Sequence, residues 1–288
     1  MAVAMRVIDL SFTIRPHFRW LVSRQLRSSH DSGALFQSSV LTVSCHAYTH
    51  VDAPVHFLPG DRDITAMPID QWMGPAAVVD LTHLGDNGEV TAEDLERRAG
   101  HVEAGDIVLL RTDWPRKTNV ESERFWSHAP WTGRGACDWL VDRRVKAVGY
   151  DYPPDHAIRT MTFSPGTPVA RHECTTHDVF FPAGITVIEY LTNLDAIGVA
   201  RCRFIALPLA IEGADGSRPR NRARRRLTGS SLQATESRSP PRTRPRRGPP
   251  WPSTWHWRGR SWPGRLRGAS STPRGTAWRP RPKPSPRA

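Results

Sequence analysis

The chain is poor in cysteine. Its four cysteines, Cys45, Cys137, Cys174 and Cys202, form no Cys-x-x-Cys pair. We therefore expect each to be a free thiol that packs as a small hydrophobic side chain, in keeping with a reducing cytoplasm.

Long apolar runs and a serine-hydrolase signature are also missing. No segment approaches the ~20 apolar residues that a membrane span requires, and residues 1–18 lack the apolar core of a signal peptide. No Gly-x-Ser-x-Gly motif is present, so a nucleophilic serine of the α/β-hydrolase type has no support. These absences predict a soluble, cytoplasmic protein without a membrane partner.

Acidic residues almost disappear after Gly216. Residues 1–216 hold 20 Lys and Arg against 27 Asp and Glu, whereas residues 217–288 hold 20 Lys and Arg against Glu236 alone. The second segment also holds 13 of the 26 prolines and few aliphatic residues, so it cannot bury a core and should be disordered. The sequence predicts a folded domain over 1–216 and a basic tail over 217–288.

The origin of this tail is open between three interpretations. Its basic residues are arginine except for Lys283, and the remainder is largely Pro, Ser, Gly, Trp, Thr and Ala. That composition fits a frame-shifted translation of GC-rich coding sequence. A solvated linker is the second interpretation. A nucleic-acid-binding arm, with Arg on phosphates and Trp stacked on bases, is the third, and we do not expect nucleic acid as a partner.

The densest group of metal-binding side chains lies in residues 46–56. His46, His50, Asp52 and His56 fall within these eleven residues, and imidazole nitrogens and carboxylate oxygens bind Zn²⁺, Mn²⁺ or Fe²⁺ in hydrolytic sites. On a helix, Asp52 would point away from the two histidines before it. On an extended segment, all four side chains lie on one side. Pro54 and the β-branched residues favour the extended form, so we expect a strand that becomes irregular near Pro54.

The spacing His-x-x-x-His-x-Asp-x-Pro-x-His resembles the signature of the cyclase family of metal-dependent hydrolases, whose members include kynurenine formamidase and isatin hydrolase. The segments Ile8–Ser11, Val148–Asp151 and Ile188–Leu194 also resemble family strands, and the resemblance covers about residues 6–216. The chain departs from the family at Tyr48, where the usual residue is Gly. We expect this Tyr to change the pocket floor or the clearance for substrate.

The resemblance implies a centre for one or two divalent ions, Zn²⁺ or Mn²⁺, in each subunit. In the family, the first two histidines and the aspartate of the motif bind metal, the aspartate can bridge two ions, and the last histidine is the general acid/base. A later His and Glu, twelve residues apart, complete the ligands. The implied ligands here are His46, His50, Asp52, His177 and Glu189, and the implied acid/base is His56.

Three further positions have alternatives. His172 is the competing late histidine, although the spacing from His177 to Glu189 matches the family better. Asp151, at the end of an expected strand, could orient a ligand or could be a plain turn residue. Trp20 could form an aromatic wall over the substrate, as the family often has there, or could anchor the N-terminal segment.

This donor set indicates hydrolysis by a metal-activated water. A divalent ion lowers the pKa of its bound water and polarises a carbonyl, and His56 would carry the proton to the leaving nitrogen. With the resemblance, this predicts an arylformamidase-like amidohydrolase that acts on a small aromatic amide such as N-formylkynurenine, giving kynurenine and formate. The alternatives are a cyclic-amide hydrolase of the isatin type and, from another class, a nucleic-acid-binding protein acting through its basic tail.

Strand-like and helix-like segments alternate along residues 1–216. Thr91–Ala99 reads as a helix with Thr91 as N-cap and Gly100 as terminator, and 136–144 reads as a second helix. The order argues for an α/β or α+β class, and the resemblance implies a single α/β domain of swivelling β/β/α type, assembled as a homodimer. The expected strands are 76–81, 106–111, 146–150, 185–191 and 204–211.

Overall fold

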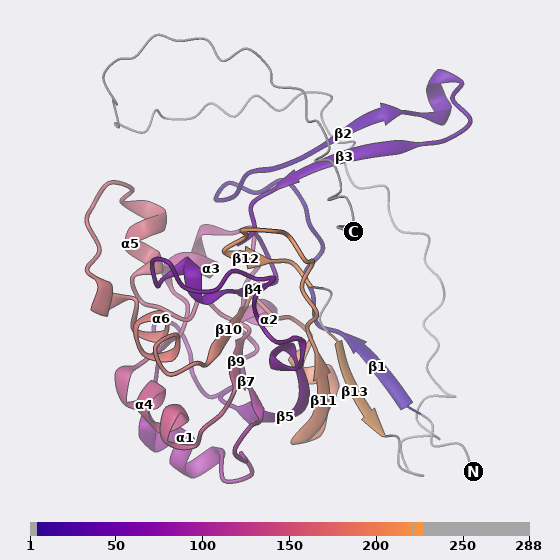
Figure 1. Cartoon of the computed structure of the whole chain (residues 1–288). Coiled ribbons are helices and arrows are strands. Elements are labelled where there is room, and N and C mark those ends of the chain that lie inside the picture. The colour runs from indigo at the N-terminus through magenta and orange to yellow at the C-terminus, as the bar shows by residue number, and fades with distance from the viewer. Residues whose placement is uncertain (1–4, 220–221, 227–288) are drawn as a thin grey trace, which may run out of the picture. The chain divides into compact units, whose positions relative to one another are not determined.

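The computed structural model describes residues 5–219 and 222–226, and a nine-stranded sheet runs through them (Figure 1). The strand order is β1-β13-β11-β5-β7-β9-β10-β4-β12. Its strands are β1 (Met5–Asp9), β4 (His50–Asp52), β5 (Met73–Asp80), β7 (Ile107–Arg111), β9 (Ala147–Tyr150), β10 (Thr186–Glu189), β11 (Arg201–Ile205), β12 (Gly216–Ser217) and β13 (Arg222–Arg226). Two small sheets pair β2 (Val22–Ser28) with β3 (Ser38–Val43), and β6 (Glu89–Val90) with β8 (Trp131–Thr132).

The centre of the large sheet is parallel, and helices cover one of its faces. Strands β5, β7, β9 and β10 pair in parallel, while β4, β11, β12 and β13 pair antiparallel with their neighbours. Helix α4 contacts both α1 and α6, and these helices lie against this parallel part (Figure 1). The helices are α1 (Ala92–Arg98), α2 (Trp114–Lys117), α3 (Glu123–Ser127), α4 (Arg134–Asp142), α5 (Ile158–Phe163) and α6 (Thr175–Phe180). The predicted α/β class, in one domain, is confirmed.

Local sequence explains the central elements. Thr91 caps α1: its hydroxyl accepts from the backbone N–H of Asp94, whose carboxylate accepts from the N–H of Thr91 in return. Strand β7 is apolar at successive positions because both sheet faces are covered. Val108 and Leu110 join the core beneath the helices, and Ile107 and Leu109 join the second core on the opposite face.

The last predicted strand differs in its second half. A strand was expected over 204–211, but β11 begins at Arg201 and ends at Ile205. Pro208 lacks a backbone N–H, which is incompatible with continued pairing inside a sheet. The chain instead leaves the sheet, with Leu209 exposed, and returns at β12 beside β4.

The sheet continues beyond the expected domain boundary at Gly216. Strand β13 lies between β1 and β11, and its Ala223 is fully buried opposite Ile8 and Phe204. Ala223 is a small apolar residue between arginines. Alternate residues of a strand face opposite sides, so Ala223 can face the core while Arg222 is exposed. The tail was also predicted to be disordered. From residue 227 onward, this prediction falls on residues that the structure does not describe.

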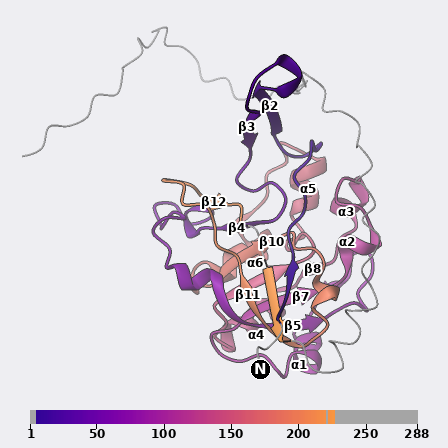
Figure 2. The ribbon, with the colours of Figure 1, turned by 90° about the vertical axis from the view of Figure 1, so that its right-hand side faces the viewer.

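The β2–β3 hairpin extends away from the nine-stranded sheet (Figures 1 and 2). Most of its side chains are exposed, including Leu26 and Leu41.

All four cysteines are free thiols, as predicted. No helix among residues 5–219 and 222–226 is long and apolar enough to cross a bilayer.

Candidate metal centre

The histidine-rich segment was predicted as a strand that becomes irregular near Pro54; the irregular part is confirmed, but the strand does not extend back to His46. His46 lies in a turn, only His50–Asp52 form strand β4, and His56 ends a short 3₁₀ turn that begins at Pro54. The four side chains therefore converge because the chain turns before and after β4. They do not converge through the two-residue repeat of a single strand. The first turn passes through Tyr48, whose φ is +56°.

The left-handed backbone at Tyr48 directs its carbonyl oxygen to His50. His50 Nδ1 lies 2.7 Å from this oxygen, which leaves Nε2 facing Asp52 at 3.2 Å and Glu189 at 3.6 Å. A positive φ explains why glycine is usual at this position in the family. Here the Tyr48 side chain is buried against Trp20, with ring centres 4.8 Å apart, so packing offsets the strain of the turn.

The carboxylate of Asp52 lies among the other four predicted ligands. Its Oδ1 lies 2.7 Å from His46 Nδ1, and its Oδ2 lies 3.6 Å from His177 Nε2. His177 Nε2 is also 3.7 Å from Glu189 Oε1. Strands β4 and β10 place Glu189 opposite His50. Both Asp52 oxygens are buried, and imidazole nitrogens of proposed ligands surround them, so a cation between these groups would meet both kinds of donor.

The buried charges support the same conclusion. Burial disfavours the ionised form of Asp52, but His50 and His46 beside it hold the pKa of this carboxyl well below its usual range. Glu189 is buried too, and both burial and the charge of Asp52 raise its pKa. Two buried carboxylates that repel each other need positive charge to ionise together, which a divalent cation would supply.

His56 stands at the open side of the centre. Its ring stacks on that of His46, with ring centres 3.9 Å apart, and it is partly exposed. Burial lowers the pKa of His56 to about 4 against the opposing charge of Asp52. The imidazole is therefore neutral near pH 7.

Two aspartates that sequence reasoning missed hold the outer nitrogens of two histidines. Asp215 Oδ2 lies 3.0 Å from His46 Nε2 and 3.7 Å from His56 Nδ1. Burial lowers the pKa of His46, but Asp52 and Asp215 raise it to about 9. Asp155 Oδ2 lies 2.6 Å from His177 Nδ1. No spacing rule singles out these aspartates, since each meets its histidine through the fold.

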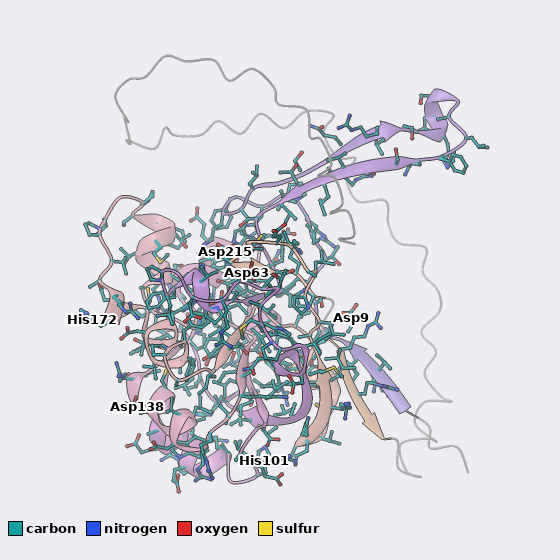
Figure 3. The ribbon with its side chains drawn as sticks, viewed as in Figure 1. Asp9, Asp63, His101, Asp138, His172 and Asp215 are labelled. Carbon is teal, nitrogen blue, oxygen red and sulfur yellow. The ribbon has the colours of Figure 1, made fainter. Side chains whose placement is uncertain are left out.

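Asp215 is fixed by the loop that precedes β12. Its backbone oxygen accepts from the N–H of Ala53 at 2.8 Å, and the N–H of Gly213 donates to Asp63 at 2.8 Å. Asp63 and Asp215 consequently lie near each other beside the centre (Figure 3). The end of the expected domain is thus part of the site.

The remaining candidates lie apart from the metal-binding atoms. His172 is exposed in the segment before α6, far from Asp215 (Figure 3), whereas His177 is in the centre. Asp151 accepts from Thr112 and from the N–H of Asp113 and so does not orient a ligand. Trp20 packs in a buried aromatic cluster, 5.6 Å from the ring of Tyr190, which lies 5.4 Å from that of His50.

Comparison with known proteins agrees with this geometry. The family described as "Putative cyclase" matches residues 8–154. Kynurenine formamidase from Bacillus cereus is 28% identical over 190 residues, covering 66% of this chain and 80% of the relative. The enzyme of that name from Erythrobacter litoralis is 29% identical over 215 residues, covering 73% and 89%. Among solved structures, isatin hydrolase A from Ralstonia solanacearum is 25% identical with a TM-score of 0.64, covering 76% and 92%.

Proposed function

The chain belongs to the putative cyclase family, and from this premise we propose that it is a metal-dependent amidohydrolase of the arylformamidase type. It cleaves the C–N bond of a small aromatic amide, as in the conversion of N-formylkynurenine to kynurenine and formate. The relatives that carry the name kynurenine formamidase support this substrate class. We propose that the enzyme acts in the cytoplasm.

The buried carboxylate of Asp52, surrounded by the imidazoles of three proposed ligands, is the observation that carries this proposal. A buried carboxylate is costly unless positive charge accompanies it. The surrounding donors are imidazole nitrogens and carboxylate oxygens, which suit Zn²⁺ or Mn²⁺. The residues that would hold one or two such ions are His46, His50, Asp52, His177 and Glu189.

The chain's own residues divide the remaining work. A bound divalent ion supplies a water of lowered pKa and a Lewis acid for the amide carbonyl. His56, neutral and at the open side, accepts the proton of the attacking water and delivers it to the leaving nitrogen. Tyr190 and Trp20 form aromatic surface behind His50, and we propose Trp20 as the substrate-facing member because it is only partly buried.

A cyclic amide of the isatin type is the second candidate substrate. The structural likeness to isatin hydrolase A favours it, and the same chemistry opens a ring when both products remain joined.

We propose a homodimer as the assembly. Exposed apolar side chains in the β2–β3 hairpin, such as Leu35 and Phe36, are available for the contact.

The test combines metal analysis with a substrate screen. The purified full chain is analysed for bound metal and assayed with N-formylkynurenine, formanilides and isatin, before and after treatment with a chelator. His50→Ala and Asp52→Ala should each lose both metal and activity, because each removes a ligand. His172→Ala, which changes an exposed histidine outside the centre, should keep both. Full metal occupancy in both ligand variants would refute the site.

A further inference from the structure

His177 is held from behind by Asp155. Nδ1 of His177 lies 2.6 Å from Oδ2 of Asp155, while Nε2 points to Asp52 and Glu189. The other oxygen of Asp155 accepts the backbone N–H of Thr176 at 2.7 Å. The carboxylate is buried and uses both oxygens, so its orientation is fixed.

The backbone before Asp155 is fixed as well. Two prolines, Pro153 and Pro154, follow the end of β9 and restrict φ at both positions. The carbonyl oxygen of Pro154 accepts from the N–H of Thr132 in β8 at 2.8 Å. A buried acceptor on a restrained segment therefore meets the histidine ring from the side opposite the metal-binding atoms.

An imidazole can bind a metal through a nitrogen only when that nitrogen carries no proton. With a carboxylate at Nδ1, the proton of neutral His177 stays on Nδ1, and the lone pair of Nε2 faces Asp52 and Glu189. Carboxylates in this relation to metal-binding histidines set both tautomer and ring orientation. We propose that Asp155 is a positioning residue that keeps Nε2 of His177 available to the metal. The inference rests on the proposed function, since it takes His177 as a ligand.

Asp151 provides a matched control within the same segment. It is as buried as Asp155, and its carboxylate accepts from Thr112 and Asp113. It contacts none of the five proposed ligands through a hydrogen bond or ion pair in the described residues. An Asn at either position removes one buried carboxylate, but only the change at Asp155 alters a histidine of the centre.

The experiment measures the affinity of the metal-free full chain for Zn²⁺ alone, by calorimetry or against a chelating dye. In Asp155→Asn, the side-chain oxygen can still accept from Thr176, but an amide N–H now faces His177 Nδ1 and moves the ring proton to Nε2. We expect the Zn²⁺ affinity to fall about 10–100-fold. Asp151→Asn should stay within about threefold of the parent affinity while its melting temperature falls, because its hydrogen bonds are structural.

A double-mutant cycle separates positioning from a general effect on folding. In a His177→Ala background, Asp155→Asn should lower the Zn²⁺ affinity no further, because its effect passes through the missing ring. Nitrogen NMR of the Zn²⁺-loaded parent should show the His177 proton on Nδ1, which tests the proposal even if a variant fails to fold. Unchanged affinity in Asp155→Asn, a further loss in the His177→Ala background, or a proton on Nε2 would each overturn it. The Zn²⁺ measurements use no amide substrate, so they are independent of the substrate screen. A parent protein that binds Zn²⁺ but hydrolyses none of the screened amides would refute the proposed function and leave the inference about Asp155 standing.

Discussion

Gly216 lies against the ring of His46. A Cβ atom added to Gly216 would stand 2.7 Å from Cε1 of that ring and 3.0 Å from the backbone oxygen of Val51. Real side chains do not approach this closely, so the ring or the strand would have to move. The position of a proposed metal ligand near the start of the chain is therefore set by a glycine near the end of the described sheet.

The first prediction is that Gly216→Ala weakens metal binding. The added methyl group forces the His46 ring or the strand to move, and the loss of a group that orients a metal ligand typically costs about 10–100-fold in affinity. The measurement is a Zn²⁺ titration of the metal-free protein. Gly100→Ala is the control, because a Cβ there would meet nothing within 4 Å, and equal affinities in the two variants would contradict the contact.

The second prediction concerns His56. His56→Ala should lower turnover by about 10²–10⁴-fold, the usual value of general acid/base catalysis, and should keep the parent's metal content. Ligand-capable atoms of His56, Asp52 and His177 all lie within 4.8 Å of one another, so metal analysis decides between two roles. Loss of metal from the variant would make His56 a ligand instead of a proton carrier.

The third prediction revises the domain boundary. A chain that ends at Arg226 keeps every described strand, so its melting temperature and hydrolysis rate should match those of the full chain. A chain that ends at Ser217 lacks β13, which leaves β1 and β11 without their shared partner. We expect the melting temperature of this shorter chain to fall by about 5 °C or more.

Equal melting temperatures for the two truncated chains would contradict this prediction and would restore the boundary near Gly216. Loss of binding to a polyanion column should accompany both truncations, because each removes most of the positive charge that lies beyond Gly216. A salt series on the column separates this charge effect from a change in fold.

The fourth prediction is a pH dependence that originates at His17. Its Nε2 lies 3.0 Å from the oxygen of Val120, and its Nδ1 accepts from the N–H of Arg19. Burial lowers the pKa of His17 below 6.5; the Val120 hydrogen bond and Glu121 oppose this, and the charge of Arg19 adds to it. A lowered pKa means that its contribution to the free energy of unfolding is present above about pH 6.5 and is lost as the pH falls through the folded value.

The parent should therefore lose stability between about pH 7 and about pH 5 faster than His17→Phe, which keeps a ring against Trp20 but cannot titrate. Denaturant unfolding at each pH gives the two curves, and their difference removes the other titrating groups. Parallel curves would show that His17 does not couple protonation to folding.

Local patterns predicted much of this fold. The Thr91 cap of α1, the continuous apolar run of β7 and the Glu189 strand depend on neighbours in sequence, and all three lie where they were expected. The left-handed turn at Tyr48 could not be predicted in this way, because tyrosine rarely adopts a positive φ. Its conformation is imposed by packing against distant aromatic rings.

Contacts between residues that are far apart in sequence could not be predicted from local patterns either. Asp155 and Asp215 reach their histidines from 22 and 169 positions away in sequence, and neither lies in a motif that singles it out. Strand β13 was hidden by charge, since its composition resembles that of the residues after it. The ligand positions came from a family pattern, whereas the groups that hold those ligands come from the three-dimensional arrangement.

Strand β4 lies between β10 and β12, and this has a consequence for biosynthesis. A ribosome makes His50 and Asp52 early, more than a hundred residues before Glu189 and the strand at 216–217. The nascent chain therefore carries an incomplete set of ligands during most of translation, exposed on a strand with neither neighbour. If the proposed ligands hold a metal ion, we expect stable binding only after Glu189 and the strand at 216–217 have been made.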